Sequence, residues 1–304
     1  MKILKKWQRS FYKKMIKYHI LSPKVIVMMD GGICSQMYQY LLGEIFRKKG
    51  YKIYYDLSFY EEWGSDIDCK FVRNYDILKL FPYLKVNKAS KPLTTIYKQK
   101  YYESGNALED TNDYSFLEKK PPLYLGGYYK LPTNIWIPNF KSTFKILPEI
   151  LDKPNQQIYS EIKQCPCPVA VHVRRGDLKI ERPVYGKPAS LEYFQSAISY
   201  IQNNCTIKPF FYFFSDEPDW IYNELIPYSK LHLMENCKVV DINSSDKGYM
   251  DLILIAQCTH QITSKGSLGK YGALLNDNNN KIVVLCNDGT SDRWKERFYN
   301  PVLL

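Results

Sequence analysis

The chain has 304 residues, of which 45% are apolar, so it is long enough to build two hydrophobic cores. Its formal net charge of +11 suggests a nucleic-acid partner, but residues 1–24 hold eight of the basic side chains and no acid. Without those eight charges, residues 25–304 carry only +3, which argues against a basic binding surface on the body of the protein. We therefore expect no nucleic-acid partner.

The first predicted element is a basic amphipathic helix within residues 1–24. Two interpretations stay open: a helix on an anionic membrane face, or a helix docked on the protein's own surface. No apolar run approaches the roughly 20 residues that span a bilayer, and no signal-peptide cleavage site follows. We expect a cytoplasmic protein that lies at the cytosolic membrane face under the first interpretation. Apolar side chains recur in this segment at steps of three and four residues, with lysines between them: Leu4, Trp7, Phe11, Met15 and Tyr18.

The next segment has the pattern that opens a parallel sheet. It predicts a strand at 25–30, a turn at Gly31 and Gly32, and a helix at 36–49. A second strand is predicted at 51–57. Residues 58–120 lack a clear period and predict short helices and loops. A helical stretch at 141–163, interrupted at Pro148 and Pro154, is expected to link the two halves of the chain.

The second half repeats the alternation of strands and helices and predicts a Rossmann-like domain. Ser190 is the expected N-cap of the first helix, and Pro218 suits the first turn of the next. The expected domains are residues 25–150 and residues 151–304. The predicted strands are 168–174, 209–214, 238–242, 260–264 and 281–286, and the predicted helices include 190–203 and 247–258.

Polar residues follow three of these strands, and ligands of open α/β sheets bind beyond the carboxyl ends of strands. His172 and Arg174 are two apart in a strand and therefore share a face. Arginine binds phosphate through a planar fork of donors, and the helix start after Gly266 adds backbone N–H groups. The pattern predicts a diphosphate site. In the alternative interpretation, Arg175 pairs with Asp177 or Asp216 and only supports the loop.

Other kinds of site are disfavoured. The turn "GGICSQ" is not a dinucleotide fingerprint, and no P-loop spacing is present. Cys34 in that turn is more typical of a small packed thiol than of a nucleophile. The eight cysteines are scattered, and the four histidines are not paired at metal-ligand spacing. We expect reduced thiols, no metal and no cofactor.

Several segments resemble the α-1,2-fucosyltransferases of glycosyltransferase family 11, in order from about residue 25 to residue 287. "VHVRRGD" matches the family's His-x-Arg-Arg-Gly-Asp motif, and "DGGICSQMYQYLLG" and "DKGYMDLILIAQCTHQI" resemble flanking segments. The resemblance implies two facing Rossmann-like domains of the GT-B type. It also implies an inverting, metal-independent transfer of L-fucose from GDP-β-L-fucose to a glycan hydroxyl, in α-1,2 linkage, for a surface polysaccharide.

The resemblance also assigns roles to residues. The first domain would bind the acceptor and the second the donor nucleotide. Catalysis would rest on Arg174, which stabilises the diphosphate with Arg175 in support, and on Asp177, which orders the loop or assists the acceptor. The donor-binding residues would be His172, Arg174, Arg175, Asp216, Lys265, Ser267, Gly31 and Gly32.

The sequence departs from the family pattern near the expected donor pocket. The stretch "KGSLGKYG" at 265–272 has Lys265, Lys270 and Tyr271 where the family has an asparagine and two tryptophans. Two alternatives to fucose transfer follow from this change. The chain either uses a different nucleotide sugar, or is an inactive paralogue that serves as an interaction module.

Overall fold

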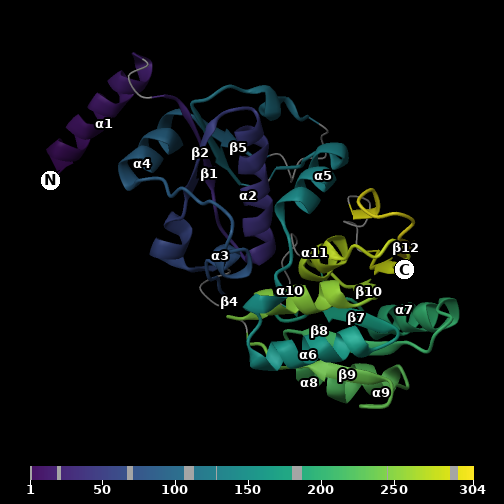
Figure 1. Cartoon of the computed structure of the whole chain (residues 1–304). Coiled ribbons are helices and arrows are strands. Elements are labelled where there is room, and N and C mark those ends of the chain that lie inside the picture. The colour runs from purple at the N-terminus through teal and green to yellow at the C-terminus, as the bar shows by residue number, and fades with distance from the viewer. Residues whose placement is uncertain are drawn as a thin grey trace. The chain divides into compact units, whose positions relative to one another are not determined.

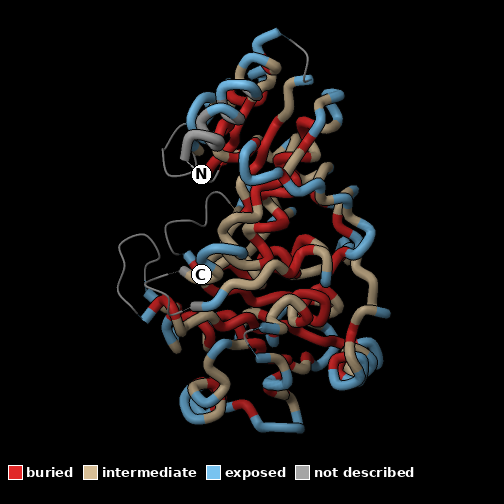
Figure 2. Tube along the Cα trace, turned by 90° about the vertical axis from the view of Figure 1, so that its left-hand side faces the viewer, coloured by how far each residue is buried: buried red, intermediate tan, exposed pale blue. Residues whose placement is uncertain are grey.

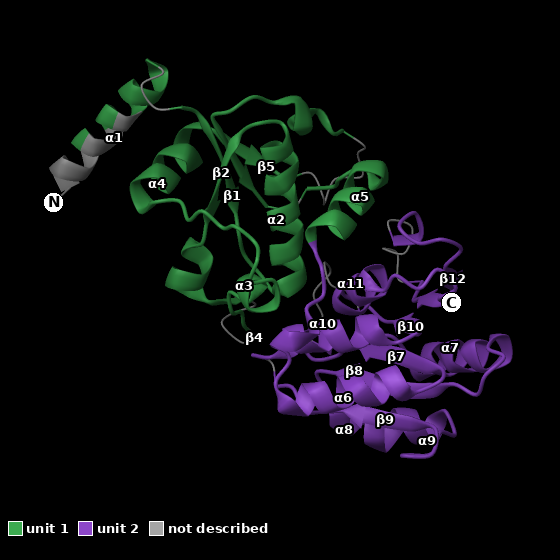
Figure 3. Cartoon of the chain, in the orientation of Figure 1, with its two compact units in different colours: residues 1–143 green, residues 144–304 purple. Residues whose placement is uncertain are grey.

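The computed structural model describes residues 2–18, 22–66, 71–105, 113–127, 129–179, 187–244, 246–287 and 294–304. It divides into two compact units, Met1–Thr143 and Phe144–Leu304, which are described separately here (Figure 1, Figure 3). Across these described ranges, no helix is both long enough and apolar enough to cross a bilayer.

In the described part of unit 1, a four-stranded sheet has the order β2-β1-β6-β5, with every pair parallel. Helix α2 (Ile33–Lys48) packs on β1 and β2, and α4 (Lys91–Lys100) covers the opposite face, where Leu93 and Tyr97 cluster with Ile26 (Figure 1). The strands are β1 (Lys24–Met28), β2 (Lys52–Asp56), β5 (Tyr102–Ser104) and β6 (Leu123–Gly126).

Shorter elements complete unit 1. Helix α1 (Lys2–Lys17) packs on α4 through Ile16, which is buried in the same cluster as Leu93. A π-helical turn at Phe59–Trp63 follows β2. The others are the antiparallel strands β3 (Ser65–Asp66) and β4 (Phe71–Val72), helices α3 (Ile77–Leu80) and α5 (Thr133–Thr143), and a 3₁₀ turn at Ser115–Glu118.

The described strands of unit 2 form a parallel sheet in the order β12-β11-β10-β7-β8-β9. Starting from β9, the strands occur as third, second, first, fourth, fifth and sixth in the chain, which is the order of dinucleotide-binding folds. The direction of winding reverses between β7 and β10, so the switch point lies there. The strands are β7 (Pro168–Val173), β8 (Phe210–Ser215), β9 (Cys237–Val240), β10 (His260–Thr263), β11 (Val283–Leu285) and β12 (Val302–Leu303).

Helices cover both faces of this second sheet. Alternate residues of β7, Val169 and Val171, pack in the core that α7 covers, while His172 contacts α11 on the other face. Figure 2 shows the buried residues running along the strands of both units. The helices are α6 (Lys153–Gln164), α7 (Leu191–Asn204), α8 (Pro218–Trp220), α9 (Ile226–Tyr228), α10 (Gly248–Gln257) and α11 (Leu268–Leu275), with a 3₁₀ turn at Pro148–Ile150 and a π-helical turn at Ile221–Leu225.

The predicted α/β class of the GT-B type is confirmed: each unit is built on a parallel, Rossmann-like sheet. Ser190 caps α7 as predicted, because its side chain accepts the N–H of Tyr193 at 3.3 Å. Pro218 opens α8, as expected. Pro154 does not interrupt a helix but lies in the first turn of α6, where its missing N–H costs nothing.

The prediction for residues 58–120 was incomplete, because β5 adds an edge strand to the first sheet. Its three residues, Tyr102–Ser104, are too few to show alternation, and only pairing with β6 defines the strand. The same reason explains why β12 was missed.

Candidate functional site

The polar residues after β7, β8 and β10 are brought together at the carboxyl edge of the second sheet. Arg174 follows β7, Asp216 follows β8, and Ser264 follows β10. The backbone N–H of Arg174 donates to the Ser264 hydroxyl at 3.0 Å, which joins the two strands on either side of the switch point. The predicted strand 168–174 ends one residue earlier, so Arg174 is the first residue of the loop.

Arg174 has two edges that face different partners. Its Nε donates to Oδ1 of Asp177 at 2.8 Å, and its Nη2 contacts Oδ2 of the same buried carboxylate. Its Nη1 lies against Gly266, where a Cβ would be only 2.6 Å away. Gly266 has a φ of +89°, which side chains rarely adopt. The carboxylate therefore orients the guanidinium so that it lies beside the turn before α11.

The turn that begins α11 is held by a buried lysine. Lys270 is 1% exposed, and its Nζ donates to the carbonyl oxygens of Ser264 and Gly266, each at 3.2 Å. Ser267 is the N-cap, but its side chain makes no capping bond. The first N–H groups of a helix have no acceptor within the helix. Together with Arg174, this helix start gives the edge the character of an anion site. Lys265 lies partly exposed in the same turn.

His172 is a buried, neutral imidazole beside this turn. It is 6% exposed, and its Nδ1 has no hydrogen-bond partner among the described residues. Burial lowers the pKa of His172 to about 3, and the nearby positive charges of Arg174 and Lys270 act in the same direction. Buried polar atoms without a partner are rare in proteins, so this nitrogen is available to a bound water, ion or ligand. The prediction that His172 and Arg174 share a face is confirmed by their contacts with Gly269 and Gly266.

Arg175 and Asp216 support the loop. The Arg175 guanidinium stacks on Trp220, with its Cζ 3.7 Å from the ring centroid, and its Nε lies 3.4 Å from Oε2 of Glu217. The alternative interpretation, in which Arg175 pairs with Asp177 or Asp216, is therefore wrong. The partners of its guanidinium are Glu217 and Trp220. The Asp216 carboxylate instead accepts the backbone N–H groups of Arg175 and Gly176, each at 2.9 Å.

Gly31 and Gly32 belong to unit 1, whereas the other predicted site residues belong to unit 2. Gly31 has a φ of +68° and joins β1 to α2, and Gly32 is the N-cap of α2. The Gly31 carbonyl accepts the Tyr60 hydroxyl at 2.9 Å and Nε2 of Gln36 at 3.2 Å. The turn is therefore tied to the segment after β2. Cys34 is buried in the first turn of α2, in accord with a packed thiol.

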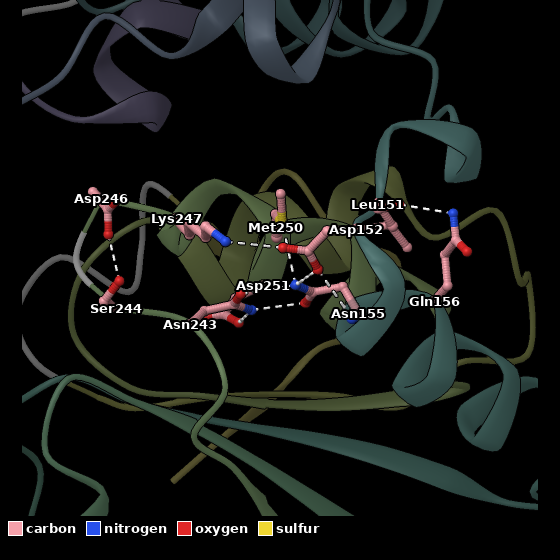
Figure 4. Close-up of polar contacts among 10 residues, drawn as sticks. All are labelled: Leu151, Asp152, Asn155, Gln156, Asn243, Ser244, Asp246, Lys247, Met250 and Asp251. Carbon is pink, nitrogen blue, oxygen red and sulfur yellow. Dashed lines mark hydrogen bonds and ion pairs between the residues drawn. The ribbon is translucent and has the colours of Figure 1, made fainter.

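A polar network near the same edge of unit 2 was missed by sequence analysis (Figure 4). Asn243, in the loop after β9, donates to Oδ1 of Asp251 at 2.7 Å and exchanges hydrogen bonds with Asn155 at 2.8 and 2.9 Å. Asp152, the N-cap of α6, binds Nζ of Lys247 at 3.0 Å. Burial raises the pKa of Asp251 to about 7. A signal for this network in the sequence is the lone acid Asp251 in the first turn of an otherwise apolar helix, "YMDLILIA".

Two units, each built on a parallel Rossmann-like sheet, are the architecture of GT-B glycosyltransferases. The chain belongs to glycosyl transferase family 11, a fucosyltransferase family, whose model matches residues 93–301. Such an enzyme uses a nucleotide-sugar donor and an acceptor.

The solved structures that are similar to this chain include three glycosyltransferases. The fucosyltransferase NodZ from Bradyrhizobium is 12% identical, with a TM-score of 0.48, over 84% of this chain and 94% of that one. A glycosyl transferase family 9 protein from Veillonella parvula is 9% identical, with a TM-score of 0.47, over 93% and 86%. ADP-heptose LPS heptosyltransferase II from E. coli is 11% identical, with a TM-score of 0.42, over 86% and 84%. Comparison with curated proteins finds no match.

Proposed function

We propose that the chain transfers L-fucose from GDP-β-L-fucose to a hydroxyl of a glycan acceptor, with inversion and without a metal. The observation that carries the proposal is Arg174, oriented by Asp177 beside the start of α11 in a family 11 chain. Departure of GDP builds negative charge on its β-phosphate, and preorganised donors stabilise that charge. Arg174 and the N–H groups of α11 would supply these donors.

The acids at this edge are already engaged by cations or N–H groups. Asp177 binds the Arg174 guanidinium, Asp216 binds two backbone N–H groups, and Glu217 binds Lys179 at 2.6 Å. A magnesium ion would need carboxylate oxygens as ligands, so the donor set supports charge neutralisation by arginine. In this proposal Asp177 and Asp216 are positioning residues, and the neutral His172 offers Nδ1 to the nucleotide.

The acceptor would bind unit 1, where a pocket of about 540 Å³ lies beside the carboxyl end of β2. Three pairs of lysine and acid line it: Lys88 with Glu61, Lys91 with Glu62 at 2.5 Å, and Lys98 with Asp56 at 3.0 Å. Ser58, Ser90, Thr94 and Thr95 also line the pocket. A mixture of charged acceptors and donors of this kind suits the hydroxyls of a sugar.

The decisive experiment is turnover of GDP-fucose with a panel of glycan acceptors. Arg174→Ala should lower kcat/KM by about 10²–10³-fold, the usual cost of one charge-stabilising donor. Lys91→Ala should raise the KM for the acceptor and leave the KM for GDP-fucose unchanged. Wild-type turnover by Arg174→Ala would contradict the assigned role.

The altered turn at 265–272, with buried Lys270 beside His172, favours testing a second candidate, transfer from a different nucleotide sugar. Thermal shift with GDP-, UDP- and dTDP-sugars separates the two. Stabilisation by GDP alone, without turnover of any GDP-sugar, would instead support an inactive paralogue that acts as an interaction module.

We further propose that α1 holds the enzyme at the cytosolic face of an anionic membrane, where lipid-linked glycans are found. Trp7 and Phe11 are 75% and 62% exposed, although Ile16 fixes the end of the helix to unit 1. Sedimentation with vesicles of phosphatidylglycerol should weaken with salt and with Trp7→Ala. Trp63→Ala, which removes an equally exposed tryptophan outside α1, is the matched control. Equal loss of binding by both variants would contradict the proposal.

A further inference from the structure

A cluster of two thiols and an imidazole lies at the amino edge of the second sheet, opposite the candidate donor site. Cys167 directly precedes β7, Cys205 follows α7, and His260 is the first residue of β10. The two sulfurs and a ring nitrogen all lie within 4.8 Å of one another. The three residues are far apart in sequence, so only the fold brings them together.

The two thiols differ in access. Cys167 is 4% exposed, whereas Cys205 is partly exposed. Burial, followed by the neighbouring Cys205 thiol that hydrogen-bonds to it, raises the pKa of Cys167 to about 12. Cys205 is therefore the sulfur that a reagent in solution reaches first, and Cys167 lies close behind it as a thiol.

The position of the proton on the His260 ring favours a pair of thiols over a metal site in this cluster. Its Nδ1 accepts the backbone N–H of Ile282 at 2.9 Å, so the neutral ring carries its proton on Nε2. A zinc ion needs a lone pair on a ring nitrogen. It would have to remove the Nε2 proton or break the bond to Ile282. A disulfide between the two cysteines requires neither change.

We propose that Cys167 and Cys205 are a redox-active pair that closes to a disulfide when the chain meets a low-molecular-weight disulfide. The Cys205 sulfur attacks the small disulfide, forms a mixed disulfide and releases one small thiol. The Cys167 sulfur then attacks the Cys205 sulfur and releases the second small thiol. Each attacking thiol loses its proton to the thiol that departs. The protein dithiol is oxidised, and one small disulfide is reduced to two thiols.

The bond would link the end of α7 to the start of β7. The closed segment contains β7, the loop with Arg174 and α7, so the cross-link restricts the unfolded chain over this whole segment. We expect the oxidised protein to melt about 5–10 °C higher than the reduced protein. Binding of GDP should not change, because the pair lies at the opposite edge of the sheet.

The test equilibrates the full chain in glutathione buffers of defined ratio, blocks remaining thiols by alkylation and maps disulfides by mass spectrometry. A peptide pair joined through Cys167 and Cys205, reversed by dithiothreitol, is the expected result. Cys205→Ala should abolish both the cross-link and the rise in Tm. Cys165→Ala, which removes a neighbouring thiol two residues from Cys167, should keep both.

Three outcomes would overturn the proposal. They are a cross-link between Cys165 and Cys167, a glutathione adduct on Cys205 that never resolves, and about one zinc ion retained per chain with the thiols protected from alkylation. The wild-type peptide map decides among them even where a variant folds poorly.

Discussion

Replacing Gly266 with alanine should displace Arg174 and weaken binding of GDP. The new Cβ would lie 2.6 Å from Nη1 and 2.8 Å from Cδ of Arg174, whereas real Cβ atoms essentially never approach within 3.0 Å. The flexible end of the arginine must therefore move away from the start of α11. Because Asp177 holds the other edge of the guanidinium, the movement also disturbs that ion pair.

The magnitude has two parts. A side chain at a φ of +89° costs about 1–2 kcal/mol of backbone strain, which lowers stability. A lost charge-assisted contact with the phosphate costs about 1.5–3 kcal/mol, which corresponds to roughly 10–150-fold in the Kd for GDP. The first part affects the melting temperature, and the second affects only binding.

Gly50→Ala is the matched control. Gly50 has a φ of +86°, and a Cβ added there would meet no atom within 4 Å, so its replacement adds similar strain without displacing anything. Isothermal titration with GDP and thermal melts of both variants separate the two parts. If Gly266→Ala bound GDP as tightly as wild type while losing the same stability as Gly50→Ala, the reasoning about Arg174 would be refuted.

Asp216→Asn should lower stability by about 1–3 kcal/mol and raise the KM for the donor, because an amide cannot accept both loop N–H groups; an unchanged melt would contradict this. Asp251→Asn should stabilise the protein at pH 8 but not at pH 4. The pKa of Asp251 is about 7 in the folded protein and 3.8 for an ordinary aspartate, so the folded state binds the proton more tightly than the unfolded state. The free energy of unfolding therefore has its full contribution from this acid below pH 4. It falls by at most about 4 kcal/mol as the pH rises to 7. Equal gains at both values, measured by denaturant unfolding, would refute that assignment. Lys270→Met should raise the pKa of His172, which NMR titration of the ring would detect, and a constant pKa would show that the charge of Lys270 does not contribute to it.

The positions of the strands in unit 2 could be predicted because each is a short apolar run followed by polar residues. Parallel strands deliver their carboxyl ends to one edge, so the sequence order alone placed His172, Arg174 and Asp216 together. The contacts that these side chains make at the carboxyl edge of the sheet could not be predicted from the order of the strands in the sequence. That the Asp216 carboxylate accepts two backbone N–H groups, and that Arg175 stacks on Trp220, depends on rotamers and loop geometry.

The features that were missed share a physical cause. Asp251 is linked through Asn243 to Asn155, which lies 88 positions before Asn243, and the cluster of Cys167, Cys205 and His260 spans three elements. Spacing rules detect partners on one helix or strand, and these partners meet only through the packing of several. Lys270 lies on an apolar helix face, where the sequence does not predict a buried ammonium group. Its burial is explained by the two carbonyl oxygens to which it donates, and these are known only from the structure.

The close approach of α11 to its neighbours limits how this region can evolve. Beyond Gly266, a Cβ on Gly269 would lie 2.7 Å from His172, and one on Gly272 would lie 2.4 Å from Ile255. At each of these three positions, spaced three residues apart, a Cβ would force a neighbouring side chain to move. Libraries that aim to change specificity should therefore vary the residues beside these glycines, such as Lys265 and Lys270, and leave the glycines fixed.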